Sequence, residues 1–464
     1  MSAGTIPTEL GTERIGVLLR KYAIPGIIAM TASSLYNMVD SMFIGRMPGT
    51  GSLALSGLAI SLPLMNISTA LGTLVGVGAS TMISILLGQK RYDTAGRVLS
   101  NAVTLNILVG VLFTALTLIW MNPILRAFGA TDNTLPFARE YMIVISIGNI
   151  VTHLYFGLNS IIRASGNPRI AMGLTLFTVI SNAVLDPLFI YTFRLGIQGA
   201  AIATVLCQTL ALIYTLIYFC KPDNFLRLKF RSLLRVDWKI ASDSLKIGMA
   251  PFLMHLASCV VAIFVNNQLL KYGGDLAIGA YGINNRLTFL FVMICLGLNQ
   301  GMQPIAGYNY GARLYSRVKK VYLKTAFWAT LVCAVGCLVA LFMPGLAVRI
   351  FTNDPPMIEL AEHGLRLMNC IFIIVGFQMV ASNLFQCLGM VRKSILMSLS
   401  RQLLFLVPCL YLLPLWLGQD GVWISFPISD GLAALLALVL IVRLFRKFSR
   451  LQDGDDPAIL GSLL

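Results

Sequence analysis

The sequence has little charge. Charged residues make up 12% of its 464 residues, whereas a soluble domain carries about 25%. Only 19 residues are acidic, and 57% are hydrophobic. With a mean hydropathy of +0.81, the composition leaves no room for a soluble domain and indicates a polytopic membrane protein.

Motifs for catalysis and metal binding are also missing. The three histidines, His153, His255 and His363, lie far apart without metal-ligand spacing, and the nine cysteines fall in apolar segments with no C-x-x-C pair. We find no P-loop, no nucleophile elbow and no pair of catalytic carboxylates in a soluble segment. We therefore expect no enzyme, no cofactor, no disulfides and no structural metal site.

Long apolar segments recur along the whole chain. We predict an all-α protein with twelve transmembrane helices, because each segment is long enough to cross a bilayer. The predicted spans are 22–44, 53–86, 98–121, 141–163, 170–192, 199–220, 245–270, 276–309, 321–343, 360–388, 394–417 and 421–442. The second and eighth are long, so we expect them to tilt or kink. The stretch Met1–Gly11 has no signal-peptide pattern, so we expect the first apolar segment to remain as a helix.

Positive charge is concentrated on one side of the predicted topology. If the chain starts in the cytoplasm, cytoplasmic segments hold 26 of the 35 Lys and Arg residues and outer segments hold seven. This asymmetry is the positive-inside rule. The net charge of +16 therefore indicates orientation and contact with anionic lipid headgroups, and we expect no nucleic-acid partner.

The chain repeats itself at an offset of about 223 residues. Gly88-Gln-Lys-Arg-Tyr92 corresponds to Gly311-Ala-Arg-Leu-Tyr315, and Arg126-Ala-Phe128 corresponds to Arg349-Ile-Phe351. A nearly constant offset across six spans predicts two parallel six-helix repeats, which is a transporter architecture. We predict an amino-terminal lobe at 1–220, a basic cytoplasmic linker at 221–243, a carboxy-terminal lobe at 244–450 and a cytoplasmic tail at 451–464.

Two carboxylates within spans are the main functional candidates. Asp40 lies one turn after Tyr36, and Asp186 lies one turn after Asn182. A charge near the bilayer centre costs about 2.5–3.5 kcal/mol even on lenient scales, so it indicates a functional site. Pro187 follows Asp186 and predicts a kink. Two further polar side chains are candidates to complete the site, Asn159 and Thr204.

Asp40 and Asp186 are both predicted toward the outer ends of their helices. Burial disfavours a charged carboxylate, and a second one nearby adds to this. Such a pair can take up and release a proton in step with a conformational change.

A third acid within a span, Asp430, has a different predicted role. Arg286 reaches a similar depth from the same side. Because intramembrane charges are usually paired, we expect a structural ion pair of Asp430 with Arg286, or with Arg401.

Polar and adaptable apolar side chains at membrane depth predict a substrate cavity. Single amides at this depth often make only interhelical hydrogen bonds, but collectively they indicate a polar lining, and Met and Phe supply adaptable walls. The residues that we expect in the cavity are Tyr36, Asn37, Met65, Asn267, Phe289 and Gln402.

These features together resemble the multidrug and toxic compound extrusion (MATE) family, within the MOP superfamily. The segments Tyr36-Asn-Met-Val-Asp40-Ser-Met-Phe-Ile-Gly-Arg46 and Asn182-x-x-x-Asp186-Pro187 carry the resemblance, which covers nearly the whole chain and looks closest to the DinF-like and MepA-like bacterial branches. The resemblance implies antiport of drugs against protons or sodium ions at the inner membrane by a rocking motion, with no cofactor. We expect a monomer.

The resemblance also assigns residues. Asp40, Asn182 and Asp186, with Asn159 and Thr204, match the cation site of the amino-terminal lobe. Pro25 matches a position where the first helix bends.

One departure concerns the coupling ion. Another branch of the family has an acid in the seventh helix, where this chain reads Val265-Asn-Asn-Gln268, which favours protons and leaves Na⁺ at the coupling site as the alternative.

Two alternative functions would each require other residues within the spans. A flippase for lipid-linked sugars would need a cavity rich in Arg or Lys, and only Arg286 and Arg401 lie within spans. A membrane-embedded enzyme would need a nucleophile with its base, or metal ligands, and neither is found.

Overall fold

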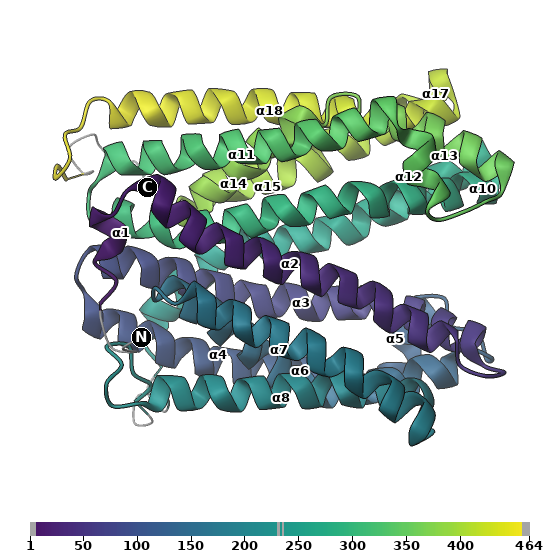
Figure 1. Ribbon diagram of the computed structural model, residues 1–464, viewed down its shortest axis with the longest axis horizontal. Coiled ribbons are helices and arrows are strands. Elements are labelled where there is room, and N and C mark those ends of the chain that lie inside the picture. Colours follow the sequence, from purple (N-terminus) through teal and green to yellow (C-terminus); the bar gives the residue numbers. More distant parts are fainter. Residues whose placement is uncertain (1–5, 230–232, 234–235, 457–464) are drawn as a thin grey trace. The chain divides into compact units, whose positions relative to one another are not determined.

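The structure is a computed structural model that describes residues 6–229, 233 and 236–456 (Figure 1). Parts of the predicted linker and tail, 230–232, 234–235 and 457–464, lie outside the described residues. Among the described residues, 11 helices are long and apolar enough to cross a membrane. A twelfth span arises if the broken pair Pro355–Asn369 and Ile373–Cys387, bent by 54°, is counted as one. The prediction of an all-α polytopic membrane protein is confirmed.

The chain forms two compact units. Unit 1 comprises Met1–Leu10 and Thr31–Phe252, and unit 2 comprises Gly11–Met30 and Leu253–Leu464. The helices that lie mainly in unit 1 are α3 (Gly51–Gly88), α4 (Tyr92–Ile119), α5 (Met121–Ala127), α6 (Leu135–Ala164), α7 (Pro168–Pro187) with the π-helical turn η1 (Leu188–Thr192), and α8 (Gly196–Cys220). The short helix α1 (Glu9–Thr12) and the long helix α2 (Ile15–Gly45) precede them.

Unit 2 contains the remaining helices. Helix α10 (Trp238–Gly311) consists of two spans, Trp238–Gly274 and Leu276–Gly311, which are separated at Gly274 by a non-helical backbone conformation. The others are α11 (Tyr315–Phe342), α12 (Pro344–Arg349), α13 (Pro355–Met368), α14 (Ile373–Cys387), α15 (Val391–Leu399), η2 (Ser400–Leu406), α16 (Val407–Leu412), α17 (Pro414–Leu417) and α18 (Gln419–Phe448).

The helix boundaries repeat at the offset seen in the sequence. Helix α4 begins at Tyr92 and α11 at Tyr315, which is 223 positions later, and α7 and α15 begin at Pro168 and Val391 with the same spacing. The loop before α4 and the loop before α11 each contain a non-glycine residue with positive φ, Lys90 and Arg313. Both six-span repeats therefore share one local backbone plan.

The boundaries of the two units differ from those of the predicted lobes. Each unit includes one segment that the prediction assigned to the other lobe, and the two segments occupy equivalent positions in the repeat. Gly11–Met30 groups with unit 2, although the prediction placed it in the amino-terminal lobe, and 244–252 groups with unit 1. Close backbone packing explains both assignments. A Cβ on Gly26 would lie 2.6 Å from the Gly297 oxygen, and one on Gly248 would lie 1.8 Å from the Leu74 oxygen, so only glycine allows these approaches. The predicted linker is also shorter than expected, because α10 already begins at Trp238.

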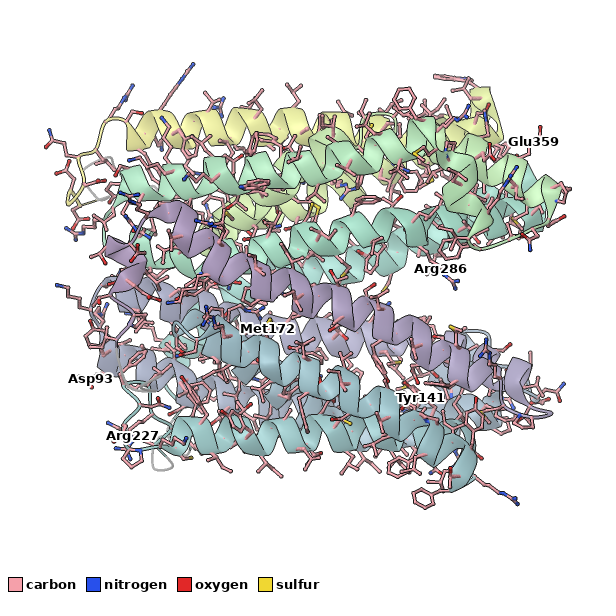
Figure 2. All side chains as sticks on the ribbon, in the orientation of Figure 1. Asp93, Tyr141, Met172, Arg227, Arg286 and Glu359 are labelled. Atoms are coloured by element: carbon pink, nitrogen blue, oxygen red, sulfur yellow. The ribbon has the colours of Figure 1, made fainter. Side chains whose placement is uncertain are left out.

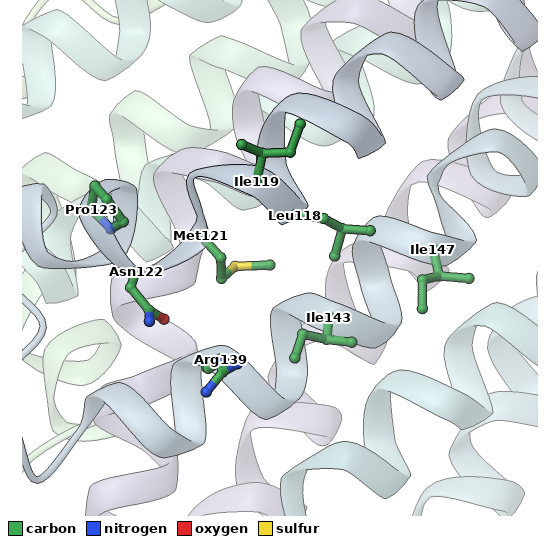
Figure 3. A pocket seen from close by; sticks show the side chains of 8 residues that line it. All are labelled: Leu118, Ile119, Met121, Asn122, Pro123, Arg139, Ile143 and Ile147. Carbon is green, nitrogen blue, oxygen red and sulfur yellow. The ribbon is translucent and has the colours of Figure 1, made fainter.

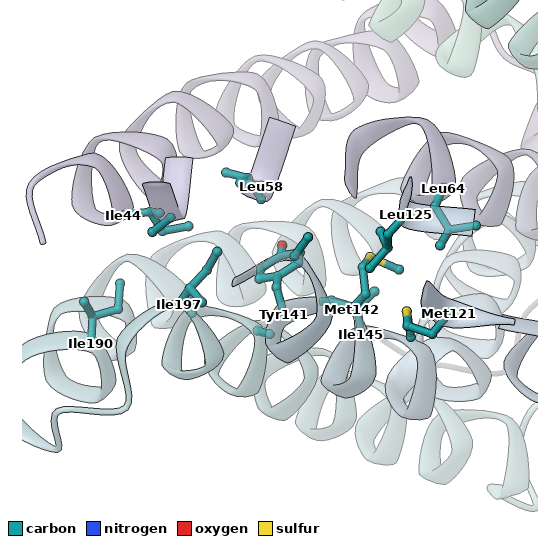
Figure 4. Packing of buried hydrophobic residues seen from close by; sticks show 14 of the residues in the cluster. Ile44, Leu58, Leu64, Met121, Leu125, Tyr141, Met142, Ile145, Ile190 and Ile197 are labelled. Carbon is teal, nitrogen blue, oxygen red and sulfur yellow. The ribbon is translucent and has the colours of Figure 1, made fainter. Parts of the chain in front are cut away.

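Each unit has its own apolar core. In unit 1 a cluster of buried side chains joins the ends of α2, α3, α6 and α8, and Figure 4 shows Tyr141 within it beside Ile145 and Ile197. In unit 2 a comparable cluster surrounds the fully buried Trp423. The unit 1 core packs against the end of α2 and the start of α8, which lie beside the candidate site.

Candidate functional site

The two candidate carboxylates meet inside unit 1. Asp40 lies near the end of α2 and Asp186 near the end of α7; the first is 9% exposed and the second is fully buried. The two carboxyl groups lie close enough to interact electrostatically with each other. Two neighbouring buried carboxylates disfavour each other's ionised form.

Polar side chains from three helices surround Asp186. The Tyr36 hydroxyl donates to Asp186 Oδ2 at 3.2 Å, and Asn182 Nδ2 donates to Asp186 Oδ1 at 2.8 Å. Asn182 Nδ2 also contacts the Tyr36 hydroxyl and lies 3.4 Å from Thr204 Oγ1. Tyr36 of α2, Asn182 of α7 and Thr204 of α8 therefore form one hydrogen-bonded network around the carboxylate.

Asp40 is less well satisfied than Asp186. Its Oδ1 is buried and receives no hydrogen bond from any described donor. A buried carboxylate oxygen without a donor is costly when ionised. Protonation of Asp40, or a cation bound beside it, would remove that cost. The binding of a proton or cation should therefore stabilise Asp40 more than Asp186.

The helix that carries Asp186 changes geometry directly after it. Helix α7 ends at Pro187, and Leu188–Thr192 form a π-helical turn. Proline lacks the N–H that an α-helix needs, and π-turns often occur at functional sites. Pro25, in contrast, lies within α2 without interrupting it.

The structure adds one neighbour of the site that was not predicted from the sequence. Tyr141 of α6 is 3% exposed and lies close enough to Asp40 and Asp186 to interact electrostatically with both. A tyrosine among apolar residues gives no periodic signal of its own, so only the packing of α6 against α2 and α7 reveals it.

Asn159 does not join this network. Its Nδ2 donates to Thr175 Oγ1 at 3.2 Å, and within the described part of the chain no hydrogen bond joins it to Asp40 or Asp186. It lies on α6 several turns from Tyr141, because α6 runs antiparallel to α7 and carries Asn159 away from the end that holds Asp186. Asn159 thus lies outside the hydrogen-bond network of Asp186, and its role in cation coupling remains a prediction.

The predicted cavity residues lie in different parts of the chain. Tyr36 is in the carboxylate network, and Met65 packs partly buried against the unit 1 core. Asn37, Asn267 and Phe289 are exposed. Gln402 Nε2 donates to Ser258 Oγ at 2.8 Å within unit 2. Their role as cavity lining remains a prediction.

A pocket of about 420 Å³ lies elsewhere in unit 1. It opens among α4, α5 and α6 and combines aliphatic side chains with one amide, Asn122, and one guanidinium, Arg139 (Figure 3). None of the predicted cavity residues lines it.

Asp430 forms an ion pair with the second of its two candidate partners. Arg401 Nε lies 2.6 Å from Asp430 Oδ1, and the Asp430 side chain is 7% exposed. Arg286 is exposed and extends away from its helix (Figure 2), and it makes no ion pair with any described residue. The predicted Arg286–Asp430 pair is therefore wrong, because the π-helical turn η2 places Arg401 toward α18 instead.

Comparisons with known proteins find a matching family and relatives that cover most of the chain. The MatE family model matches residues 25–188 and 247–412. The multidrug export protein MepA of Staphylococcus aureus strain N315 is 30% identical over 421 residues, which cover 90% of this chain and 92% of that protein. MepA of Staphylococcus saprophyticus is 28% identical with the same coverage.

Solved structures agree with the sequence relatives. The multidrug transporter DinF-BH, solved in complex with the dye rhodamine 6G, superposes with a TM-score of 0.87 at 34% identity and covers 93% of this chain and 96% of that chain. A MATE crystal structure in the bent conformation gives a TM-score of 0.90 at 24% identity over 96% of this chain and 99% of that chain, which shows the shared fold. These relatives are transporters and not enzymes. The chain belongs to the MatE family of multi-pass membrane transporters.

Proposed function

We propose that this protein is a multidrug efflux antiporter of the inner membrane that exports cationic and amphipathic compounds in exchange for protons. The similarity to MepA, named a multidrug export protein, and to DinF-BH, solved with the rhodamine dye, supports the substrate class. The protein acts without a cofactor and as a monomer. Its amino and carboxy termini face the cytoplasm, since 26 of 35 Lys and Arg residues then lie on the cytoplasmic side.

One observation carries the proposal for proton coupling. Asp40 and Asp186 are both buried and lie close enough to interact electrostatically. Taking up one proton neutralises a charge that the protein otherwise has to stabilise away from water. Among the described residues, no group of three or more His, Cys, Asp or Glu side chains gathers around a common point, which favours a proton over a multivalent cation.

The proposed mechanism couples the two ligands through α2. With Asp40 and Asp186 deprotonated, the site favours the state that accepts a cationic drug. Protonation from the outside neutralises the pair, relaxes the contacts of Tyr36, and lets α2 bend near Pro25 so that the drug leaves outward. The proton and the drug then each shift the equilibrium between the straight and the bent α2, which is the condition for coupling.

A flippase for lipid-linked sugars receives less support. It would need unpaired basic side chains to hold a pyrophosphate. Arg401, one of the two basic residues predicted within spans, is already paired with Asp430.

The decisive experiment measures export of the rhodamine dye from proteoliposomes that contain the full chain. We expect export under a pH gradient alone and none under a sodium gradient alone. Export under a sodium gradient alone would mean that Na⁺, and not the proton, is the coupling ion. Export under neither gradient would overturn antiport.

A variant tests the site directly. Asp40→Asn should abolish export driven by a pH gradient, whereas Asp132→Asn, which alters an exposed acid paired with Arg126 at 2.9 Å, should leave it unchanged. Continued proton-driven export by Asp40→Asn would refute the assignment.

A further inference from the structure

A line of polar side chains continues from the carboxylate site along the contact between α6 and α7. On α7, Thr175 and Thr178 precede Asn182 by about two turns and one turn, and all three lie on one face of the helix. On α6, Tyr155 and Asn159 are one turn apart. We call Tyr155, Asn159, Thr175 and Thr178 the inner polar stripe.

The two helices contact each other through this stripe. Tyr155 Oη lies 3.5 Å from Thr178 Oγ1, and Asn159 Nδ2 donates to Thr175 Oγ1 at 3.2 Å. Both threonine hydroxyls donate their own protons to backbone carbonyls, Thr178 to Thr175 and Thr175 to Ala171, at 2.8 and 3.1 Å. Their lone pairs therefore remain available toward α6 as acceptors.

The two stripe residues on α6 are buried and the two threonines on α7 are half-buried, and one buried oxygen of the stripe has no partner among the described residues. Tyr155 is 1% exposed and Asn159 is 6% exposed. Asn159 Oδ1 is buried without a hydrogen bond to any described donor. Buried polar atoms are nearly always satisfied, by protein or by ordered water, so this oxygen marks a place for a water molecule beside Thr175.

The stripe leads away from the carboxylates toward the loop between α6 and α7. From Asp186 to Thr175 the helix covers about 16 Å at 1.5 Å per residue. Helix α6 lies on the other side of the stripe, and its last turn contains Arg163. Arg163 is close enough to Tyr155 to interact electrostatically with it. In the proposed orientation this end faces the cytoplasm.

The chemistry of the stripe suits a proton better than a metal cation. It contains hydroxyls and an amide but no carboxylate, whereas a hard cation takes several oxygen ligands at each resting place. Hydroxyls and single waters can pass a proton between them. The interval of one turn between Thr178 and Asn182, about 6 Å, is a distance that water bridges.

We propose that the inner polar stripe, with water held at Asn159, is the path by which the coupling proton leaves the Asp40–Asp186 pair for the cytoplasm. The proton departs from the carboxyl O–H of Asp186 and passes through waters beside Asn182 and Thr178 to the water at Asn159, and that water releases one of its own protons to solvent at the cytoplasmic end of the stripe. No group is oxidised or reduced, and the carboxylate is regenerated. The inference rests on the proposed proton-coupled function.

The test removes the hydroxyls of the stripe while preserving side-chain shape. The variant is Thr175→Val combined with Thr178→Val, in the full chain, in proteoliposomes loaded with a pH-sensitive dye. We expect proton flux and rhodamine export to fall at least tenfold, while the Kd for rhodamine stays within twofold. The corresponding double Ser variant should recover both rates to within twofold of the wild type.

A matched control separates the path from general packing. Thr215 of α8 is fully buried, lies outside the stripe and donates to the carbonyl of Ala211 at 2.8 Å, so Thr215→Val should retain wild-type rates. The Val pair should also show a larger slowing in D₂O than the wild type. Wild-type rates in the Val pair, or a Ser pair as slow as the Val pair, would overturn the path while leaving antiport intact. Absence of pH-driven export in the wild type itself would instead overturn the proposed function.

Discussion

Breaking the buried ion pair in unit 2 tests the structure most directly. Arg401→Met removes the guanidinium and keeps most of the aliphatic volume, which leaves the Asp430 carboxylate, 7% exposed, without its 2.6 Å partner. Removing one member of a buried pair costs about 3–5 kcal/mol, because an uncompensated charge stays buried.

The size of the effect depends on which partner is removed. The Arg401 side chain is 29% exposed, so part of its charge is already solvated and the loss lies nearer to about 3 kcal/mol. For a unit of about 200 residues, 1 kcal/mol corresponds to about 2–4 °C; we therefore expect Arg401→Met to lower the melting temperature by about 6–12 °C. Asp430→Asn should cost less, because Arg401 can extend toward solvent.

The chain offers its own reporter for this measurement. Cys295 and Cys333 are fully buried in unit 2, so a thiol-reactive dye reports their exposure as the protein is heated in detergent. A double variant, Arg401→Met with Asp430→Asn, should recover most of the loss, because it leaves no buried charge. If the double variant is as unstable as the sum of the single variants, the two residues do not interact and the reasoning fails.

Two further predictions concern hydrogen bonds, one in each unit. Tyr36→Phe removes a donor from Asp186, a bond to a charged group worth about 1.5–3 kcal/mol, so proton-driven rhodamine export should fall about tenfold or more, whereas Tyr191→Phe, which loses only a backbone contact at 2.6 Å, should retain export in the same vesicle assay. Asp453→Ala removes the carboxylate that accepts from the backbone N–H of Ser316 at 3.0 Å, a capping contact worth about 0.5–2 kcal/mol; hydrogen exchange should increase at the start of α11, and unchanged exchange there would contradict the capping role.

The sequence by itself determined the fold class and singled out the two carboxylates within membrane spans. Apolar segments of bilayer length can only be helices, since a backbone in lipid has to satisfy its own hydrogen bonds. The 223-residue offset predicted the repeat, and the helix starts at Tyr92 and Tyr315 reproduce it. Asp40 and Asp186 were recognisable because a carboxylate in an apolar helix is costly wherever that helix packs.

The tertiary structure decided which side chains meet. Helical spacing predicts a shared face within one helix, but contacts between helices depend on register, tilt and local irregularity. The sequence therefore could not choose between Arg286 and Arg401 as the partner of Asp430, which the π-helical turn η2 settles. Nor could it show that Asn159 bonds to Thr175, away from the carboxylates. The sequence identifies a polar residue within a membrane helix. Its hydrogen-bonding or ion-pair partner depends on how the neighbouring helix packs against it.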